Sequence, residues 1–412
     1  MQSLSTSQPS SKKIWITVMV AALGYFVDIY DLLLFSIIRI DSLKSLGYTS
    51  DKDIENYGHL LINTQMIGLL LGGLLWGTLG DKKGRLSVLF GSIITYSLAN
   101  IANGFVQNIE QYVVLRFIAG IGLAGELGAG ITLVNEIMSK EKRGYGVTIV
   151  ASVGLLGAVF ASVLSQEFGW RPAYWIGGGM GVALLLLRVG VAESGLFGKA
   201  KQEGVKLGNF SMILTNSKRL KTYLCSILCT IPVWYVIGLL VTFCKEFGQA
   251  LQMPEIPKPA VAILFAYAGL SVGDMASGII SQWTRSRKKV QYGFISLGAI
   301  MSIIYLTSSH LSLEVFYGLC FVLGMFSGYW VISITSVSEH FGTNLRATVT
   351  TTVPNFVRGS FVLVDICYNL LKEPLGKIES AMWVGAVVFI LAIWAVTQLE
   401  ETFGKDLNFQ ES

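Results

Sequence analysis

Seven ionisable side chains lie inside long apolar stretches of this sequence: Asp28, Asp31, Arg116, Glu126, Asp274, Arg358 and Asp365. In hydrocarbon surroundings each such charge costs at least about 2.5 kcal/mol, and charges kept at that cost usually serve binding or proton transfer. These residues are therefore the first candidates for functional groups. The sequence identifies no partner for Asp274.

Asp28 and Asp31 are three residues apart, so they share one face of a helix. Two carboxylates that close resist simultaneous ionisation, which suits one of them to bind and release a proton near neutral pH. The alternative is that one acid caps or pairs structurally. Asp31 is the favoured proton carrier because it lies deeper in the apolar stretch.

Arg116 and Glu126 lie ten residues apart on one predicted helix. This spacing corresponds to about 15 Å along the helix axis, so the two side chains cannot pair with each other. Arg116 is placed to pair with Asp28 or Asp31, and protonation of the acid would then release it. The alternative is a static ion pair. With the two aspartates, Arg116 and Glu126 complete the predicted proton-coupling set.

Arg358 is the predicted clamp for a substrate carboxylate, because a guanidinium group binds a carboxylate through two parallel hydrogen bonds. Asn355 precedes it by one helical turn and joins the predicted site. Asp365 follows by seven residues on the same face and is predicted to neutralise Arg358. Pro354 is expected to bend the helix there.

Aromatic side chains also interrupt the middle of apolar stretches, away from the ends where Trp and Tyr usually gather in membrane helices. We predict that five of them contact the substrate: Tyr30, Trp234, Tyr235, Tyr329 and Trp330. The alternative is that they face lipid or the protein core.

The composition shows which elements must position these residues. The chain has 412 residues, of which 52% are hydrophobic and 14% charged. A soluble protein carries about 25% charged residues, so this chain has too little charge to cover a soluble surface. The net charge of +5 is too small for a nucleic-acid-binding protein. Five cysteines in apolar stretches and three scattered histidines predict neither a disulfide scaffold nor a metal centre. The sequence shows no constellation of residues typical of a catalytic nucleophile, so an enzyme is not predicted. It also shows no nucleotide-binding motif, so ATP is not the predicted driving force.

A spanning helix needs roughly 20 apolar residues. Twelve segments meet this length, and an even number places both ends of the chain on one side. They are residues 14–38, 58–80, 86–107, 110–138, 143–166, 170–192, 221–244, 258–282, 290–309, 311–337, 343–370 and 378–399.

The basic residues predict the orientation. One set of connections holds 20 Lys and Arg residues and the other holds 8, so the first set is predicted to be cytoplasmic. The predicted organisation is a cytoplasmic tail (1–13), a six-helix bundle (14–192), a cytoplasmic linker (193–220), a second six-helix bundle (221–399) and a cytoplasmic tail (400–412). Both termini are then inside the cell.

The two halves share a spacing pattern. In the first half Gly125 is followed by Glu136 and Arg143, and in the second half Gly328 is followed by Glu339 and Arg346. The two sets are offset by 203 residues, which favours an internal duplication. Parallel repeats of this kind place a substrate site between the halves near the middle of the membrane. We predict that both Glu–Arg sets close the inner side as charge pairs; the alternative is independent solvated charges.

The loop between the second and third segments reads Gly77, Asp81, Gly84 and Arg85 in a glycine–acid–glycine–arginine pattern. Gly84 can adopt the positive φ of a tight turn, Asp81 can cap the next helix, and Arg85 can anchor at the lipid surface. This pattern resembles the signature loop of the major facilitator superfamily. The alternative is a plain basic hairpin.

Further segments are similar to the metabolite:proton symporter group of that superfamily, which includes carriers of organic acids, proline and betaine. They are the Arg followed by Gly-x-Gly and Gly-Glu in residues 116–126, the acid-x-Tyr-Asp of residues 28–31, and Arg188 followed by Glu193. The superfamily resemblance covers the whole chain, whereas the subgroup resemblance covers residues 24–200. With the loop and rim residues above, Arg188 and Glu193 complete the predicted gating set.

The resemblance implies an all-α integral membrane protein with twelve transmembrane helices in two pseudo-symmetric six-helix bundles, working by alternating access. It further implies proton-driven uptake of a small polar metabolite, a carboxylate or a zwitterion, across the cytoplasmic (inner) membrane. The proton gradient is the expected driving force, with no other cofactor and no metal. The expected partners are the substrate, protons and the lipid bilayer, with no nucleic acid, and the protein is expected to be a monomer.

Two alternatives remain open from the sequence. The first is an exporter of the same fold for a drug-like compound or a carboxylate-type siderophore. The second is a membrane sensor that binds a ligand without transporting it.

Overall fold

The structure is a computed structural model that describes residues 11–83, 85–126, 143–193 and 210–405, and these residues form helices and connecting turns without a β-strand. Each of the twelve predicted segments is mainly helical where it is described, with turns inside some of them. The first half contains α1 (Ser11–Ser45), α2 (Asp51–Lys83), α3 (Arg85–Asn103), α4 (Ile109–Leu123), α6 (Arg143–Phe168) and α7 (Trp170–Glu193).

The second half begins with α8 (Ser211–Leu214). Next come α9 (Ser217–Leu228), α10 (Ile231–Trp234) and the π-helix η2 (Tyr235–Val241), and these three correspond to the predicted segment 221–244. It continues with α11 (Cys244–Ala250), α12 (Pro259–Thr284), α13 (Arg287–Thr307), α14 (Leu313–Ser327), α15 (Trp330–His340), α16 (Thr343–Leu375) and α17 (Lys377–Gln398).

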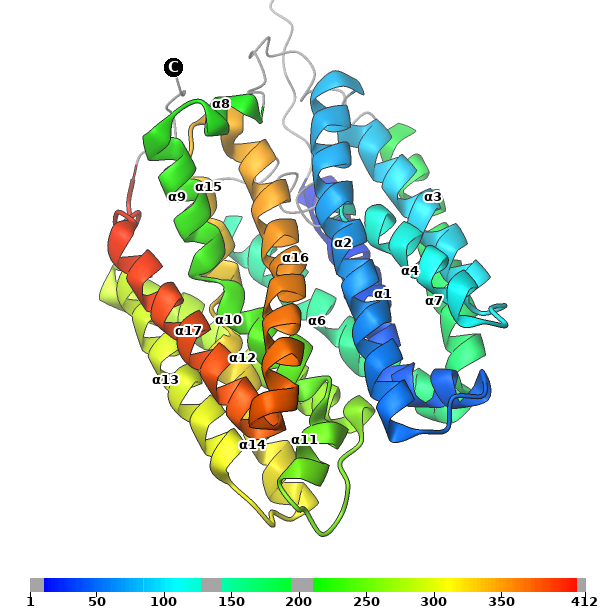
Figure 1. Cartoon of the computed structure of the whole chain (residues 1–412). Coiled ribbons are helices and arrows are strands. Elements are labelled where there is room, and N and C mark those ends of the chain that lie inside the picture. Colours follow the sequence, from blue (N-terminus) through cyan, green and yellow to red (C-terminus); the bar gives the residue numbers. More distant parts are fainter. Residues whose placement is uncertain (1–10, 84, 127–142, 194–209, 406–412) are drawn as a thin grey trace, which may run out of the picture.

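The helices pack as two groups that follow the two halves of the sequence (Figure 1). In the first group α1 packs on α6 and α7, and α4 packs on α2 and α3. In the second group α12 packs on α14, and α13 packs on α17. The groups meet where α2 contacts α16, α6 contacts α12 and α1 contacts α12. Parts of the predicted tails and linker (1–10, 194–209 and 406–412) lie outside the described residues, and the predicted boundaries stay predictions.

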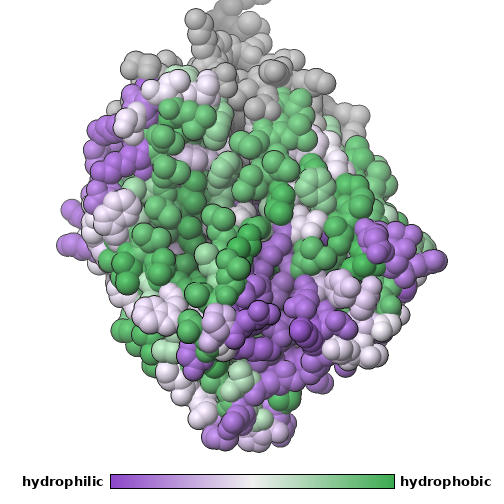
Figure 2. All heavy atoms as spheres, in the orientation of Figure 1, coloured by the Kyte–Doolittle hydropathy of each residue, from purple (hydrophilic) through white to green (hydrophobic). Residues whose placement is uncertain are grey.

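The outer surface of the helices is suited to lipid. Seven described segments are long and apolar enough to cross a membrane by length and composition, and shorter apolar helices lie at residues 88–103 and 153–168. Large apolar side chains such as Leu186, Leu363 and Trp383 are exposed, and most of the face in Figure 2 is hydrophobic. A hydrophilic area interrupts this face over the lower halves of α2 and α16 (Figures 1 and 2).

Two helices break at positions that the predicted repeat relates. After α4, the N–H of Gly125 donates to the carbonyl of Gly122 at 3.4 Å. After α14, the N–H of Gly328 donates to the carbonyl of Met325 at 3.1 Å. These two turns are again offset by 203 residues, so the backbone repeats the spacing that the sequence indicated. Both breaks lie on buried glycine contacts, Gly125 against Ser92 and Gly328 against Gly273.

Candidate functional site

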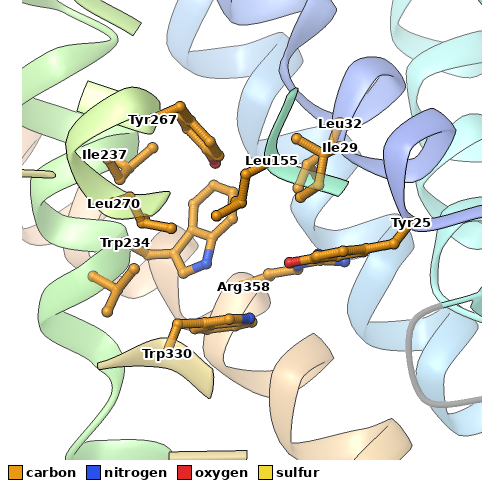
Figure 3. Close-up of a pocket in the computed structure, with 11 residues that line it drawn as sticks. Tyr25, Ile29, Leu32, Leu155, Trp234, Ile237, Tyr267, Leu270, Trp330 and Arg358 are labelled. Carbon is orange, nitrogen blue, oxygen red and sulfur yellow. The ribbon is translucent and has the colours of Figure 1, made fainter. Parts of the chain in front are cut away.

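A cavity lies between the two groups of helices (Figure 3). The first group lines it with Tyr25, Ile29, Leu32 and Leu155, and the second with Val233, Trp234, Ile237, Tyr267, Leu270, Trp330 and Arg358. Four of these side chains are aromatic, and Arg358 is the one charged residue among them. The free volume is about 20 Å³, which holds a water molecule and little more, so the side chains have closed around the site.

Arg358 reaches this cavity from α16 and is 1% exposed. Its Nη2 atom lies 3.3 Å from Oδ2 of Asp28 on α1, an ion pair that joins the two halves. Its Nε and Nη1 atoms have no hydrogen-bond partner among the described residues. Each unmet donor is costly to bury, so this guanidinium has the chemistry to bind an anion; its role as a carboxylate clamp stays a prediction.

The two aspartates of α1 have different surroundings although both are fully buried. Asp28 pairs with Arg358, as above. Asp31 points into the first group of helices, where Arg116 and Asn100 face it, yet neither of its oxygens accepts a hydrogen bond within the described chain. The predicted pairing of Arg116 with one of these acids is therefore not made as a hydrogen-bonded ion pair.

Arg116 instead contacts neutral groups. It donates through Nη2 to Oε1 of Gln65 and through Nη1 to the hydroxyl of Tyr174 at 3.5 Å. Its guanidinium also lies over the ring of Phe35, 5.2 Å from the ring centroid. These neutral partners accept from both terminal nitrogens but leave Nε of Arg116 without a partner among the described residues, and Asp31 stays near enough to act through the electrostatic field.

Glu126 forms a two-pronged ion pair with Arg188 of α7, and both side chains are buried. The pair packs against Gly24 of α1, where a Cβ atom would collide with both side chains. The sequence placed Glu126 among the proton-coupling residues and Arg188 among the gating residues, and it did not pair them. The structure joins the two predicted sets at this point.

Two of the five predicted substrate aromatics, Trp234 and Trp330, line the cavity. The other three do not line the cavity in this conformation. Their hydroxyls donate to backbone carbonyls within their own half: Tyr30 to Ala173, Tyr235 to Ala381 and Tyr329 to Cys229. These bonds hold the rings in helix–helix contacts away from the cavity.

Sequence reasoning missed Tyr25 and Tyr267, which complete the aromatic lining. Tyr25 lies one helical turn before Asp28, and Tyr267 lies two turns before Asp274, so both share a face with an acid that was singled out. This shared helix face was the sequence feature that could have identified the two tyrosines as cavity residues.

Two assignments around Arg358 need correction. Asp365 does not neutralise Arg358: it lies 2.5 Å from Nδ1 of His59 and accepts a hydrogen bond from Asn63. Seven residues bring two side chains to one face but also about 10 Å apart along the axis, which is too far for contact. Asn355 does not line the cavity and instead donates to the carbonyl of Ala124 at 2.8 Å, another link between the halves.

Asp274, which had no partner in the sequence, caps a broken helix. Its Oδ1 atom accepts the N–H of Val331 at 3.2 Å, at the first turn of α15. Close glycine packing makes this reach possible, since Gly273 of α12 contacts Gly328 at the break. A carboxylate at a helix N-terminus accepts hydrogen bonds from free N–H groups and interacts favourably with the positive end of the helix dipole. Asp274 thereby fixes the turn that carries Trp330 into the cavity.

A belt of four ion pairs and one His–Asp contact joins the two halves at the end of the molecule predicted to face outward, and we name it the outer seam. Its members are Arg39–Glu246 at 2.8 Å, His59–Asp365 at 2.5 Å, Lys245–Asp51 at 2.6 Å, Lys372–Glu55 at 3.1 Å and Lys377–Glu55 at 2.7 Å. It coincides with the hydrophilic area of Figure 2. Each pair links a residue of α1 or α2 to one of the second half.

Phe243 lies at the centre of the outer seam. The ring of His59 stacks on it at 3.8 Å between centroids, and the guanidinium of Arg39 lies 4.4 Å from its centroid. Arg39 is fully buried, and a Cβ atom at Gly58 would collide with its side chain. The seam is thus a packed layer and not a set of loose surface charges.

At the opposite rim the structure revises one predicted pair. Glu339 contacts Arg287 at 3.2 Å and accepts a hydrogen bond from Thr402 at 2.7 Å. Arg346 donates to the carbonyls of Ser338 and Phe341. The described contacts of Glu339 are therefore with residues other than Arg346.

The structure describes only some of the remaining residues that were predicted to act in gating. Gly77 lies against Thr352 of α16, so α2 and α16 approach closely there. Gly84 and Glu136 lie outside the described residues, as do the side chains of Asp81, Arg85, Arg143 and Glu193. Their roles stay predictions.

Known proteins resemble this chain over most of its length. The Major Facilitator Superfamily matches residues 14–362. A Haemophilus influenzae protein with a provisional assignment to metabolite transport is 26% identical, covering 96% of this chain and 98% of its own length. The gentisate transporter of Corynebacterium glutamicum is 23% identical over 92% of this chain and 88% of its own. The benzoate transport protein of Acinetobacter baylyi is 25% identical over 81% and 78%.

Proposed function

This chain belongs to the Major Facilitator Superfamily and is a multi-pass membrane transporter, and we propose that it carries a small aromatic carboxylate together with a proton into the cell. The family and the all-α membrane fold were predicted from the sequence and are confirmed, and its relatives are transporters and not enzymes. The substrate, the proton and the direction of transport are the proposed part.

The observation that carries the proposal is the combination of one under-satisfied guanidinium and four aromatic rings in a single cavity between the halves. A carboxylate is held best by two parallel hydrogen bonds, and on Arg358 these would come from Nη2 together with the unmet Nη1 or Nε, so the substrate competes with Asp28 for Nη2. Aromatic rings favour stacked or edge-on contacts with a second ring. Benzoate and gentisate, which name two relatives, combine these two features.

Proton coupling follows from competition for Arg358. In the present conformation Asp28 occupies one of its donors. A substrate carboxylate and an ionised Asp28 would place two negative charges on one cation, which disfavours ionisation of one of them. Binding of a proton to the Asp28–Asp31 set therefore frees Arg358 for substrate. Release of that proton restores the Asp28–Arg358 pair and expels the substrate.

The outer seam supplies the complementary gate. In the proposed cycle the seam opens to admit substrate and proton from outside and re-forms once both are bound. Its buried pairs can hold the halves together only when they are close, because the attraction between charges falls once water separates them. The protein is proposed to reside in the cytoplasmic membrane with both termini inside and to use the proton gradient as its energy source.

Reconstituted protein in proteoliposomes tests the proposal. With an imposed inward proton gradient, wild-type protein should accumulate radiolabelled benzoate, and a protonophore should abolish the accumulation. A thermal-shift screen with benzoate, nicotinate, acetate and betaine identifies the substrate class independently of flux. Efflux without accumulation would favour the exporter, and a thermal shift without any flux would favour the sensor.

Arg358→Ala should weaken benzoate affinity by about 10- to 100-fold, since a hydrogen bond to a charged group contributes about 1.5–3 kcal/mol. Arg171→Ala is the matched control, because Arg171 donates to the carbonyls of Gly104 and Val106 outside the cavity. Unchanged affinity in Arg358→Ala would remove the carboxylate clamp.

A further inference from the structure

A polar stripe runs along the buried face of α3, a helix that otherwise reads as an ordinary apolar span. It consists of Tyr96, its neighbour Ser97, and then Asn100 and Asn103, which follow Ser97 at intervals of three residues, so the four lie on one side of the helix. All four are at most 1% exposed. In a lipid-spanning helix such residues are expected to find partners within the protein.

The stripe is under-satisfied at every position. The hydroxyls of Tyr96 and Ser97, both amide atoms of Asn100 and Oδ1 of Asn103 have no hydrogen-bond partner among the described residues. Thr95, on the same helix but beside the stripe, donates to the carbonyl of Gly91 at 2.7 Å. The lack of partners is thus a property of the stripe and not of α3 as a whole.

Other helices direct further unpartnered polar atoms toward the same interior. They are both oxygens of Asp31 on α1, Nε2 of Gln65 on α2 and Nε of Arg116 on α4. Asn100 lies close enough to Asp31 to interact with its carboxyl group, although the geometry leaves no hydrogen bond between them. On the fourth side α7 contributes glycines: Gly177 lies against the Asp31 carboxylate and Gly181 against Ser97. At both positions a Cβ atom would collide with these polar side chains, so α7 packs closely against them and leaves their polar atoms facing the interior of the group.

A buried polar atom without a partner costs about 1–3 kcal/mol, so a dry cluster of this size would be strongly destabilising. Buried water is the usual partner of such atoms and makes about three hydrogen bonds each. The polar atoms of α1, α2, α3 and α4 supply the donors and acceptors that a row of waters needs.

The stripe also connects groups that the transport cycle uses. Asn103 is the last residue of α3, toward the outer side, and Tyr96 lies seven residues inward, about 10 Å along the axis. Tyr96 is close enough to interact electrostatically with Asp31 on one side and with Glu126 and Arg188 on the other. None of the four stripe residues lines the substrate cavity.

We propose that the α3 stripe forms a hydrated proton path inside the first group of helices, which delivers protons to Asp31 behind α1 and separately from the substrate cavity. Protons would move along hydrogen-bonded waters between Asn103 and Asp31 and onward past Tyr96 toward the Glu126–Arg188 pair. No bond other than O–H bonds forms or breaks. This inference rests on the proposed function, since it supplies the proton that Asp31 carries.

The transport test compares three variants in proteoliposomes that contain a trapped pH-sensitive dye. Asn100→Leu, which keeps the volume but removes the polar atoms, should reduce proton influx and benzoate accumulation at least about 10-fold, consistent with a step whose rate depends on proton transfer. Benzoate counterflow, which needs no net proton movement, should remain near the wild-type rate. Asn100→Ser, which leaves room for water, should restore most of the influx, and Thr95→Val should behave as wild type.

The outcomes separate the path from the proposed function. Wild-type coupling in Asn100→Leu, or equal impairment in Asn100→Ser, would overturn the path and leave carboxylate transport intact. Failure of wild-type protein to accumulate benzoate would instead overturn the proposed function.

Radiolytic hydroxyl-radical labelling tests the water itself without any substrate. The radicals form from water beside a side chain, so Tyr96 should be oxidised faster than Tyr235 in the purified full chain. Tyr235 is the matched control because it is equally buried, while its hydroxyl donates to Ala381. Equal protection of the two tyrosines would show that the stripe is dry and would refute the path.

Discussion

The outer seam and the membrane centre use the same kinds of charged residue in opposite ways. In the seam, each Lys or Arg of the described pairs has an acid within 3.1 Å, and although Nε and Nη1 of Arg39 have no hydrogen-bond partner among the described residues, Nη1 lies 2.8 Å from Glu246. At the centre, Arg358 shares one contact with Asp28 at 3.3 Å and keeps two donor atoms unmet, while Asp31 has no hydrogen bond among the described residues.

The contrast separates two tasks. Matched charges satisfy one another, so they favour one conformation and act as a closure. Unmatched charges keep a demand for a further partner, so they suit binding of an anion or a proton. The following predictions test this contrast between matched and unmatched charges, from the largest expected effect to the smallest.

Asp31→Asn should have the largest effect, a complete loss of proton-driven benzoate accumulation. The amide is close to the carboxyl in shape but cannot carry a proton through the cycle. Counterflow exchange should persist, because the cavity around Arg358 is unaltered. Accumulation that survives in both Asp28→Asn and Asp31→Asn would refute the coupling assignment, and the two variants measured together provide the control for position.

Glu246→Gln should open the outer seam by leaving the fully buried Arg39 without its counter-charge. Removal of one partner of a buried pair costs about 3–5 kcal/mol, enough to shift the balance between conformations by more than about 100-fold. Labelling of a cysteine introduced at Phe243 with a membrane-impermeant reagent should rise accordingly. Restored protection in the charge-exchanged variant Arg39→Glu with Glu246→Arg would confirm the pair, and protection that never changes would argue against a gate.

Asp274→Ala should lower benzoate affinity by about 5-fold or more, because the lost cap of α15 costs about 1 kcal/mol and releases Trp330. Asp274→Asn should retain most of the affinity and full accumulation, since its amide oxygen accepts the same Val331 N–H. Loss of accumulation in the Asn variant would instead make Asp274 a proton carrier.

Asp51→Asn should have the smallest effect. Its pair with Lys245 belongs to the same seam, but the Asp51 side chain is 61% exposed. Exposed pairs contribute less than about 1 kcal/mol. Labelling at position 243 should change less than about 5-fold, and a change as large as in Glu246→Gln would mean that burial does not rank the seam pairs.

Much of the architecture was predictable, because a membrane-spanning helix is recognised from roughly 20 residues of continuous apolar sequence. The repeat offset of 203 residues was predictable too, and it reappears in the turns at Gly125 and Gly328. The charges at the membrane centre were found for the same reason: they are rare in such a background. The choice of Arg358 and Trp330 as cavity residues follows from that rarity.

The pairing of these charges was not predictable from spacing. Arg358 meets Asp28 and not Asp365, Glu126 meets Arg188, and Glu339 meets Arg287. Helix periodicity tells which residues share a face but not which face of which other helix lies opposite. Tyrosines illustrate the same limit, because Tyr235 turned toward a carbonyl of its own half while Tyr267 turned to the cavity.

The break between α14 and α15 has a mechanical consequence. Glycine contacts hold α14 backbone to backbone against α12, as at Gly324 with Ala266 and at Gly273 with Met325. Beyond Gly328, α15 is tied to α12 by the Asp274 cap. We therefore expect the outer half of this span to travel with α12 as one stiff body. The inner half, α15, is then expected to rotate about the break at Gly328. This break lies beside the ring of Trp330, which in the proposed function covers the bound substrate.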